Sequence, residues 1–268
     1  MECFIDKTFI EQELQKWKEH LDKKYGLNKI AYIALYGSQN YHLSTKKSDV
    51  DVKAIYIPTI EESIFNEKKV SETIVLESGA HCEVKDIREM NKMFLKQNTN
   101  FLEILFTDYY WINPIYKNQI EIMRSNAEAI AFCNKEVALF SILGQTKRAV
   151  KDYTFKKNKD LKYLAKIFFF FCFLEKYENA VCDYKNCLLA AENTPSAEYG
   201  SIQNLILTLK SGKVEQKEIE EIEKSFYTIR TYLHSKEAEW KKEKNKFLNT
   251  SPAIKEVLNT IAFQMIMK

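Results

Sequence analysis

Two short segments decide the fold, IAYIALYGS at residues 30–38 and SDVDV at residues 48–52. The first is an apolar run of strand length that stops at a Gly-Ser pair, and the second alternates carboxylates with valines. Because residues i and i+2 of a strand project from the same face, Asp49 and Asp51 are expected on one face. The valines between them are then expected to point into a core.

Paired carboxylates beside a Gly-Ser bend predict a site for a metal-bound phosphate. Two adjacent carboxylates repel each other unless a cation lies between them, and Mg²⁺ (or Mn²⁺) takes oxygen ligands and bridges carboxylates to substrate phosphates. Gly37 would let the backbone approach a phosphate closely, and the Ser38 hydroxyl with free amides would complete an anion pocket. The alternative is a turn that carries two exposed aspartates on an edge strand. It explains the polar residues but not the apolar segments on both sides.

These residues resemble the signature of the DNA polymerase β-type nucleotidyltransferases, in which Gly-Ser is followed after about ten residues by Asp-apolar-Asp-apolar. The fuller strings, GSQNYHL at residues 37–43 and SDVDVK at residues 48–53, are similar to the RlaP-like branch, which is associated with RNA ligase. The resemblance implies an enzyme that transfers an NMP from an NTP to a hydroxyl. It implies that Asp49 and Asp51 bind two Mg²⁺ ions, and that Lys53 lies at the nucleotide.

A third carboxylate is expected on a later strand. Residues 70–76 and 80–87 read as a hairpin around Glu-Ser-Gly, and alternation places Glu83 on one face of the second strand and Asp86 on the other. Residues 98–105, NTNFLEIL, resemble the family's Asn-x-x-x-x-Glu-x-Leu segment. That alignment makes Glu83 the third catalytic and metal-binding carboxylate. The alternative is that Glu83 is a solvent-facing strand residue with no role.

The expected fold class is α+β. Periodicity predicts a helix over residues 7–25, strands over 29–36 and 50–57, and a short helix over 59–65. After Asn113-Pro114 the alternating pattern gives way to long helical periodicities. We therefore expect a small mixed β-sheet nucleotidyltransferase domain with flanking helices over residues 1–114, followed by an all-α domain over residues 115–268.

The second half carries an excess of positive charge. Residues 1–115 contain 15 Lys and Arg against 18 Asp and Glu, and the remainder contains 25 against 19. Lys147 and Lys162 begin pairs of lysines at helical spacing, which would suit a nucleotide triphosphate or a nucleic-acid backbone. A solvated helix face is an equally good explanation. The sequence departs from the family where Lys166 and Phe169 replace a His and an Arg.

Composition excludes several classes of protein. Of the 268 residues, 46% are hydrophobic and 29% are charged, and the six cysteines form no CxxC pair. No apolar run approaches the roughly 20 residues of a membrane helix, and the first residues, MECFID, lack a signal-peptide core. We expect a cytoplasmic protein with reduced cysteines and no membrane partner.

The expected substrates are an NTP and an RNA or tRNA 3′ end. The same metal site would serve nucleotidylation of a protein or of a small molecule. A different class of function is a catalytically silent nucleotide-binding or regulatory module, for example one encoded by a phage. The intact Gly-Ser and Asp-x-Asp residues favour an enzyme, whereas the missing His and Arg favour the silent module.

Overall fold

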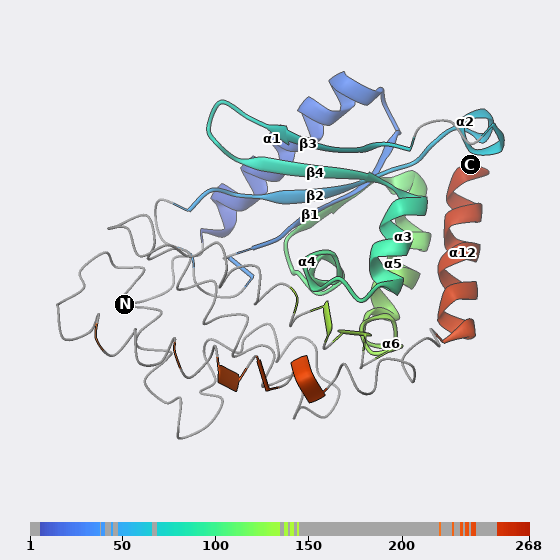
Figure 1. The fold of residues 1–268 in the computed structure, drawn as a ribbon. Coiled ribbons are helices and arrows are strands. Elements are labelled where there is room, and N and C mark those ends of the chain that lie inside the picture. The colour runs from blue at the N-terminus through green and yellow to red at the C-terminus, as the bar shows by residue number, and fades with distance from the viewer. Residues whose placement is uncertain are drawn as a thin grey trace.

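The computed structural model describes residues 6–37, 39–40, 44, 48–65, 69–134 and 251–268, together with scattered positions between 137 and 239. Its centre is a five-stranded sheet in the order β3-β4-β2-β1-β5 (Figure 1). The strands are β1 (Ile30–Leu35), β2 (Val52–Tyr56), β3 (Ser71–Val75), β4 (His81–Asp86) and β5 (Tyr110–Ile112). The pair β2–β4 is parallel and the other pairs are antiparallel. The predicted α+β class with a mixed sheet is confirmed.

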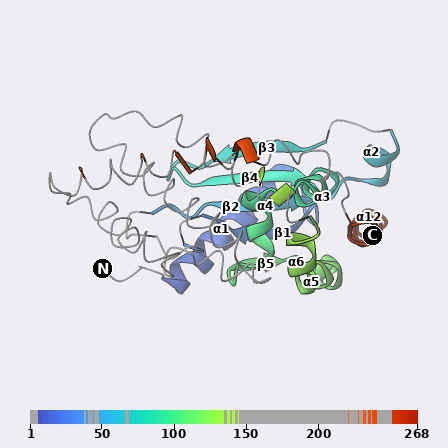
Figure 2. The same cartoon turned by 60° about the horizontal axis from the view of Figure 1, so that its bottom comes forward.

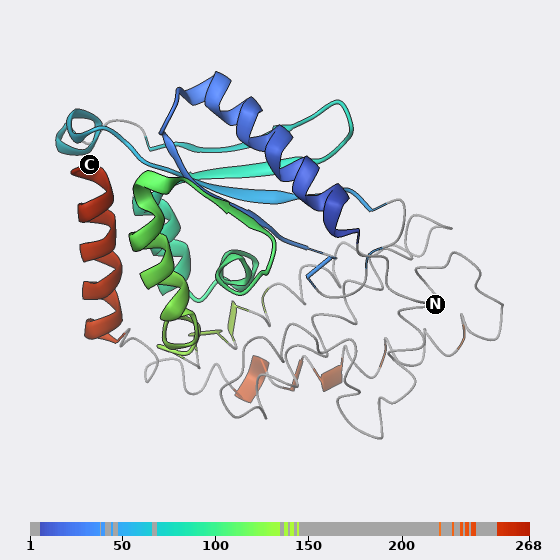
Figure 3. The same cartoon turned by 180° about the vertical axis from the view of Figure 1, so that it is seen from behind.

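One face of the sheet is covered by α1 (Lys7–Tyr25), which crosses the strands in Figure 3. The predicted helix over residues 7–25 is thus confirmed, and it begins where the Asp6 side chain accepts the Phe9 amide at 3.0 Å. Its apolar stripe packs against alternate residues of β1, β2 and β4. Trp17, at the middle of this stripe, is fully buried, and its Nε1 donates to the Val50 carbonyl at 3.4 Å.

The opposite face packs against α3 (Ile87–Leu95), α4 (Thr99–Leu102) and the 3₁₀ helix η1 (Glu103–Leu105). The Tyr32 hydroxyl of β1 donates to the Ile104 carbonyl at 2.6 Å. From α5 (Lys117–Ser125), Arg124 donates to the Tyr32 hydroxyl at 2.6 Å and to the Thr107 carbonyl at 2.9 Å. These bonds fix the segment after α4 against the sheet.

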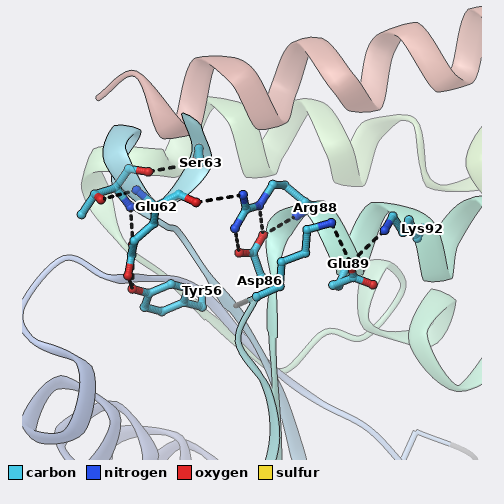
Figure 4. Close-up of polar contacts among 9 residues, drawn as sticks. Tyr56, Glu62, Ser63, Asp86, Arg88, Glu89 and Lys92 are labelled. Atoms are coloured by element: carbon cyan, nitrogen blue, oxygen red, sulfur yellow. Dashed lines mark hydrogen bonds and ion pairs between the residues drawn. The ribbon is translucent and has the colours of Figure 1, made fainter. Parts of the chain in front are cut away.

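A polar cluster joins the far ends of β2 and β4 to α2 (Ile60–Ile64) and α3 (Figure 4). Arg88 makes a bidentate ion pair with Asp86, at 2.6 and 2.9 Å, and the Asp86 side chain also caps α3. Glu62 accepts from the Tyr56 hydroxyl at 3.2 Å and closes a capping box with Thr59. Asp86, which alternation places on the opposite face of β4 from Glu83, is therefore occupied by structural contacts.

The C-terminal helix α12 (Pro252–Ile266) returns to the first half of the chain and packs on α3 and α5. Figure 2 shows it nearly end-on beside α5 and α6 (Ala127–Ala131). Asn91 of α3 donates to the Leu258 carbonyl at 2.8 Å. The boundary predicted at residue 114 stays a prediction, because most of the second half lies outside the described residues. Within the described part of the chain, no helix has both the length and the apolar character of a membrane span.

Candidate active site

The glycine bend and the aspartate segment lie side by side at one end of β1 and β2. The Tyr36 amide donates to the Asp51 carbonyl at 3.0 Å, which extends the antiparallel pairing past the end of both strands. Gly37 follows with φ 97°, a left-handed conformation that favours glycine. The Asn40 amide then donates to the Gly37 carbonyl at 3.0 Å and closes a turn. The two motifs of the sequence therefore meet in space.

The aspartate segment keeps the predicted alternation although β2 begins only at Val52. Val50 and Val52 are buried, whereas Asp49 is exposed and the Asp51 side chain is 33% exposed. Among the described residues, all polar contacts of the Asp51 carboxylate fall on Oδ1. They come from the His81 amide at 2.9 Å and from His81 Nδ1 at 3.3 Å. Asp51 thus stands at the start of β4 as well as β2.

Glu83 forms an ion pair with a buried lysine. The parallel register of β2 and β4 places Lys53 opposite Glu83, with Lys53 Nζ 2.7 Å from Glu83 Oε2. Lys53 is only 2% exposed, and its ammonium lies 3.8 Å from the ring centroid of Tyr36 and 4.3 Å from that of Phe101. Lys85 adds a second contact, 3.2 Å from Glu83 Oε1. Both oxygens of the predicted third carboxylate are therefore neutralised by lysines.

The pKa values reflect this crowding of charge. Burial lowers the pKa of the Lys53 ammonium, and the Glu83 carboxylate offsets only part of that effect. For Glu83, burial raises the pKa, but Lys53 and Lys85 together outweigh it, so the pKa is lowered. Burial also raises the pKa of the Tyr36 phenol, with further contributions from the nearby charges of Asp51, Glu83 and Glu103. Tyr36 is therefore close enough to Asp51, Glu83 and Glu103 for the charge of each to affect its pKa.

The fit of a divalent cation differs between the predicted ligands. In the described part of the chain, no three His, Cys, Asp or Glu side chains are grouped as a metal site. Asp49 and Asp51 fit an ion that proteins often hold by one or two carboxylates and substrate phosphates. Glu83 does not fit while both lysines neutralise it. Its predicted role as a ligand therefore requires the ion pair with Lys53 to open.

Some of the other predicted site residues lie within the described part of the chain and some lie outside it. Lys53, expected at the nucleotide, is enclosed between two aromatic rings and faces Glu83. Gly37 is placed at the bend, but its amide already donates to Glu103 Oε1 at 2.9 Å. The residues that lie outside the described part of the chain are Ser38, Lys147, Lys162, Lys166 and Phe169.

Sequence reasoning missed the residues that surround the bend from the α4–η1 side. Glu103 is fully buried and binds Gly37, and Phe101 covers the Lys53 ammonium. Thr107 is also buried and donates to the Asn40 side chain at 2.8 Å. Two signals for Glu103 were present. It is the Glu of the Asn-x-x-x-x-Glu-x-Leu segment, and a lone acidic residue inside the apolar run FLEILF is unusual unless it is paired.

Comparison with known proteins places the chain in one family. A model of the family described as "RNA repair pathway DNA polymerase beta family" matches residues 7–258. The class is therefore that of the DNA polymerase β-type nucleotidyltransferases. Within it, the chain belongs to the RlaP family.

The other two comparisons do not define the family further. A crystal structure of a nucleotidyltransferase-like protein from Exiguobacterium sibiricum is similar, with 10% identity over 83% of this chain and 75% of that chain. Its TM-score is 0.36. Comparison with curated protein sequences gives no match.

Proposed function

We propose that the protein transfers a nucleoside monophosphate from an NTP to the 3′ hydroxyl of an RNA, with tRNA as the first candidate. Membership of the RlaP family supports the reaction class, and the family's description as part of an RNA repair pathway supports an RNA acceptor. The observation that carries the proposal is the hydrogen bond of 3.0 Å from the Tyr36 amide to the Asp51 carbonyl. It sets the glycine bend directly beside the aspartate segment.

In this proposal the chain contributes chiefly position and charge. Asp49 and Asp51 would hold Mg²⁺ (or Mn²⁺), and the turn that starts at Gly37 would hold the phosphates of the NTP. At that position a divalent cation would lower the pKa of the attacking hydroxyl and offset the negative charge of the departing pyrophosphate. The acceptor hydroxyl would lose its proton to solvent, and its oxygen would form a bond to the α-phosphorus while the bond to pyrophosphate breaks. Fixed geometry and electrostatics supply most of the catalysis in such reactions.

The proposal is tested by incubating the full chain with Mg²⁺ and each labelled NTP, with total tRNA, with other RNA, or with no acceptor. We expect label transfer to RNA that Asp51→Asn abolishes, because the neutral amide removes one of the negatively charged carboxylates by which proteins hold Mg²⁺ beside substrate phosphates. The substituted side chain keeps an oxygen that can accept the His81 amide, so the melting temperature should stay close to wild type. A matched control is Glu121→Gln, an exposed carboxylate that pairs with Lys117 on α5. Transfer that survives in Asp51→Asn would contradict the assignment.

A second candidate is a nucleotide-binding module without turnover. The observation that favours it is the ion pair of Glu83 with Lys53 and Lys85, which occupies the third acidic position. This module would bind an NTP and transfer no label to RNA, protein or small-molecule acceptors. Label found on the protein itself or on a small molecule would instead retain the enzyme and change its acceptor.

A further inference from the structure

The turn at Gly37 is hydrogen-bonded to residues 103–107, a segment to which the sequence motifs gave no role in the site. Gly37 donates its amide to Glu103 Oε1 at 2.9 Å, and Thr107 Oγ1 donates to Asn40 Oδ1 at 2.8 Å. The first and last residues of the turn are therefore each bound to this segment. Asn40 also donates from Nδ2 to the Leu35 carbonyl at 3.0 Å, which ties the turn back to β1.

The 103–107 segment is itself fixed. The Thr107 amide donates to the Glu103 carbonyl at 3.2 Å, so the two contact residues are one helical turn apart in a hydrogen-bonded unit. Arg124 donates to the carbonyls of Ile104 and Thr107 at 3.3 and 2.9 Å. Glu103 is fully buried and Thr107 is 3% exposed. A hydrogen bond to a carboxylate is stronger than one between neutral groups, especially away from water.

We infer that Glu103 and Thr107 are positioning residues, which fix the Gly37–Asn40 turn in the shape that binds the phosphates of the NTP. The inference rests on the proposed function and extends it to residues that touch neither metal nor nucleotide. The Gly37 amide is committed to Glu103, so this amide orients the turn and does not bind phosphate. A site whose supporting bonds are lost binds its ligand less tightly, because the turn must then be ordered at the moment of binding.

The test measures NTP affinity by titration in the presence of Mg²⁺, well below the melting temperature of every variant. Glu103→Leu removes the acceptor of the Gly37 amide, and we expect the Kd for NTP to rise about tenfold or more. Glu103→Gln keeps an acceptor oxygen in the same place, so its Kd should stay within a fewfold of wild type. Thr107→Val should raise Kd severalfold, and Thr107→Ser should restore it.

A control separates positioning from stability. Asn91→Leu removes another buried polar group, whose Nδ2 donates to the Leu258 carbonyl of α12. It should lower the melting temperature and leave the Kd for NTP unchanged. If Glu103→Leu and Thr107→Val also bind NTP like wild type, the positioning role is wrong.

Hydrogen exchange distinguishes failure of this inference from failure of the proposed function. The amides of Gly37, Gln39 and Asn40 should exchange faster in Glu103→Leu than in wild type, whether or not NTP binds. If the wild type binds no NTP and exchange is still faster in Glu103→Leu, then Glu103 supports the turn but the turn does not bind a nucleotide. Unchanged exchange together with unchanged affinity would show that Glu103 neither supports the turn nor contributes to nucleotide binding.

Discussion

The ion pair between Lys53 and Glu83 predicts an asymmetry between two substitutions. Lys53 is 2% exposed, whereas the Glu83 side chain is 27% exposed and keeps Lys85 at 3.2 Å. Glu83→Gln would leave a nearly enclosed ammonium without its counter-charge. Lys53→Met would leave a carboxylate that still has water and a second lysine. The first change should therefore cost much more stability than the second.

The magnitudes follow from these exposures. Removal of one partner of a buried ion pair costs about 3–5 kcal/mol. Because Gln keeps an acceptor for the ammonium, we expect Glu83→Gln to lower the free energy of unfolding by about 3 kcal/mol, the lower end of that range. For Lys53→Met we expect about 1 kcal/mol, since the Met stem keeps the packing on Tyr36 and Phe101. The double variant should be close to Lys53→Met alone and more stable than Glu83→Gln.

The pH dependence gives the same prediction a second readout. Burial already lowers the pKa of Lys53, and loss of Glu83 lowers it further. An unfolded lysine keeps its proton up to about pH 10.4. Between the folded pKa and that value the unfolded state binds more protons, so stability rises with pH by at most about 1.4 kcal/mol per unit. The penalty in Glu83→Gln is complete below the folded pKa and is lost as pH rises toward the unfolded one.

Urea unfolding of the full chain at pH 7 and pH 9 measures both effects. The matched control is Glu89→Gln, since Glu89 is 24% exposed and pairs with Lys69 at 3.0 Å and Lys92 at 2.9 Å. Those lysines are much more exposed than Lys53, so this change should cost at most about 1 kcal/mol at either pH. The reasoning is refuted if Glu83→Gln costs no more than Glu89→Gln, or if its deficit against the double variant does not shrink at pH 9.

Three further predictions concern the frame around the site. Arg124→Met should lower the free energy of unfolding by about 2–4 kcal/mol in urea, because the guanidinium binds the Tyr32 hydroxyl and two carbonyls, and Arg124→Lys should not restore it. Thr59→Ala removes a capping box and should cost about 1 kcal/mol, seen as faster hydrogen exchange confined to α2. Leu258→Ala should cost about 2–5 kcal/mol, because Leu258 is fully buried on α12; an unchanged melting temperature would show that α12 is not part of the cooperative core.

Local patterns were sufficient for the elements of the first half. The predicted helices and strands between residues 7 and 87 are all present, with ends shifted by at most two residues. Their apolar residues repeat with the period of a helix or of a strand, so each element can be recognised from residues that are close in sequence. The strand β5 was missed because it has three residues. It exists through pairing with β1, in which Ala34 lies opposite Tyr110, and no local pattern encodes such a partner.

The partner of Glu83 is a second example of what local patterns omit. Alternation correctly placed Glu83 on a polar strand face, but a face does not specify register. The parallel pairing of β2 with β4 brings Lys53 opposite Glu83 across 30 residues of sequence. A shift of one residue would have set Glu83 against Val52 or Ala54, on the sheet face opposite to Asp51 and Lys53. The nature of the third acidic position therefore depends on long-range geometry.

That register has a consequence for a polyanionic substrate. The pKa of Tyr36 is raised in part by the charges of Asp51, Glu83 and Glu103. An incoming triphosphate would therefore meet a strongly negative face if none of these carboxylates were neutralised. Lys53 and Lys85 neutralise Glu83, and the Gly37 amide binds Glu103. The exposed Asp49 and the partly exposed Asp51 are then the carboxylates that a metal-bound nucleotide would meet first. The lysines accordingly concentrate the uncompensated negative charge at the two positions where a cation accompanying the phosphates would balance it.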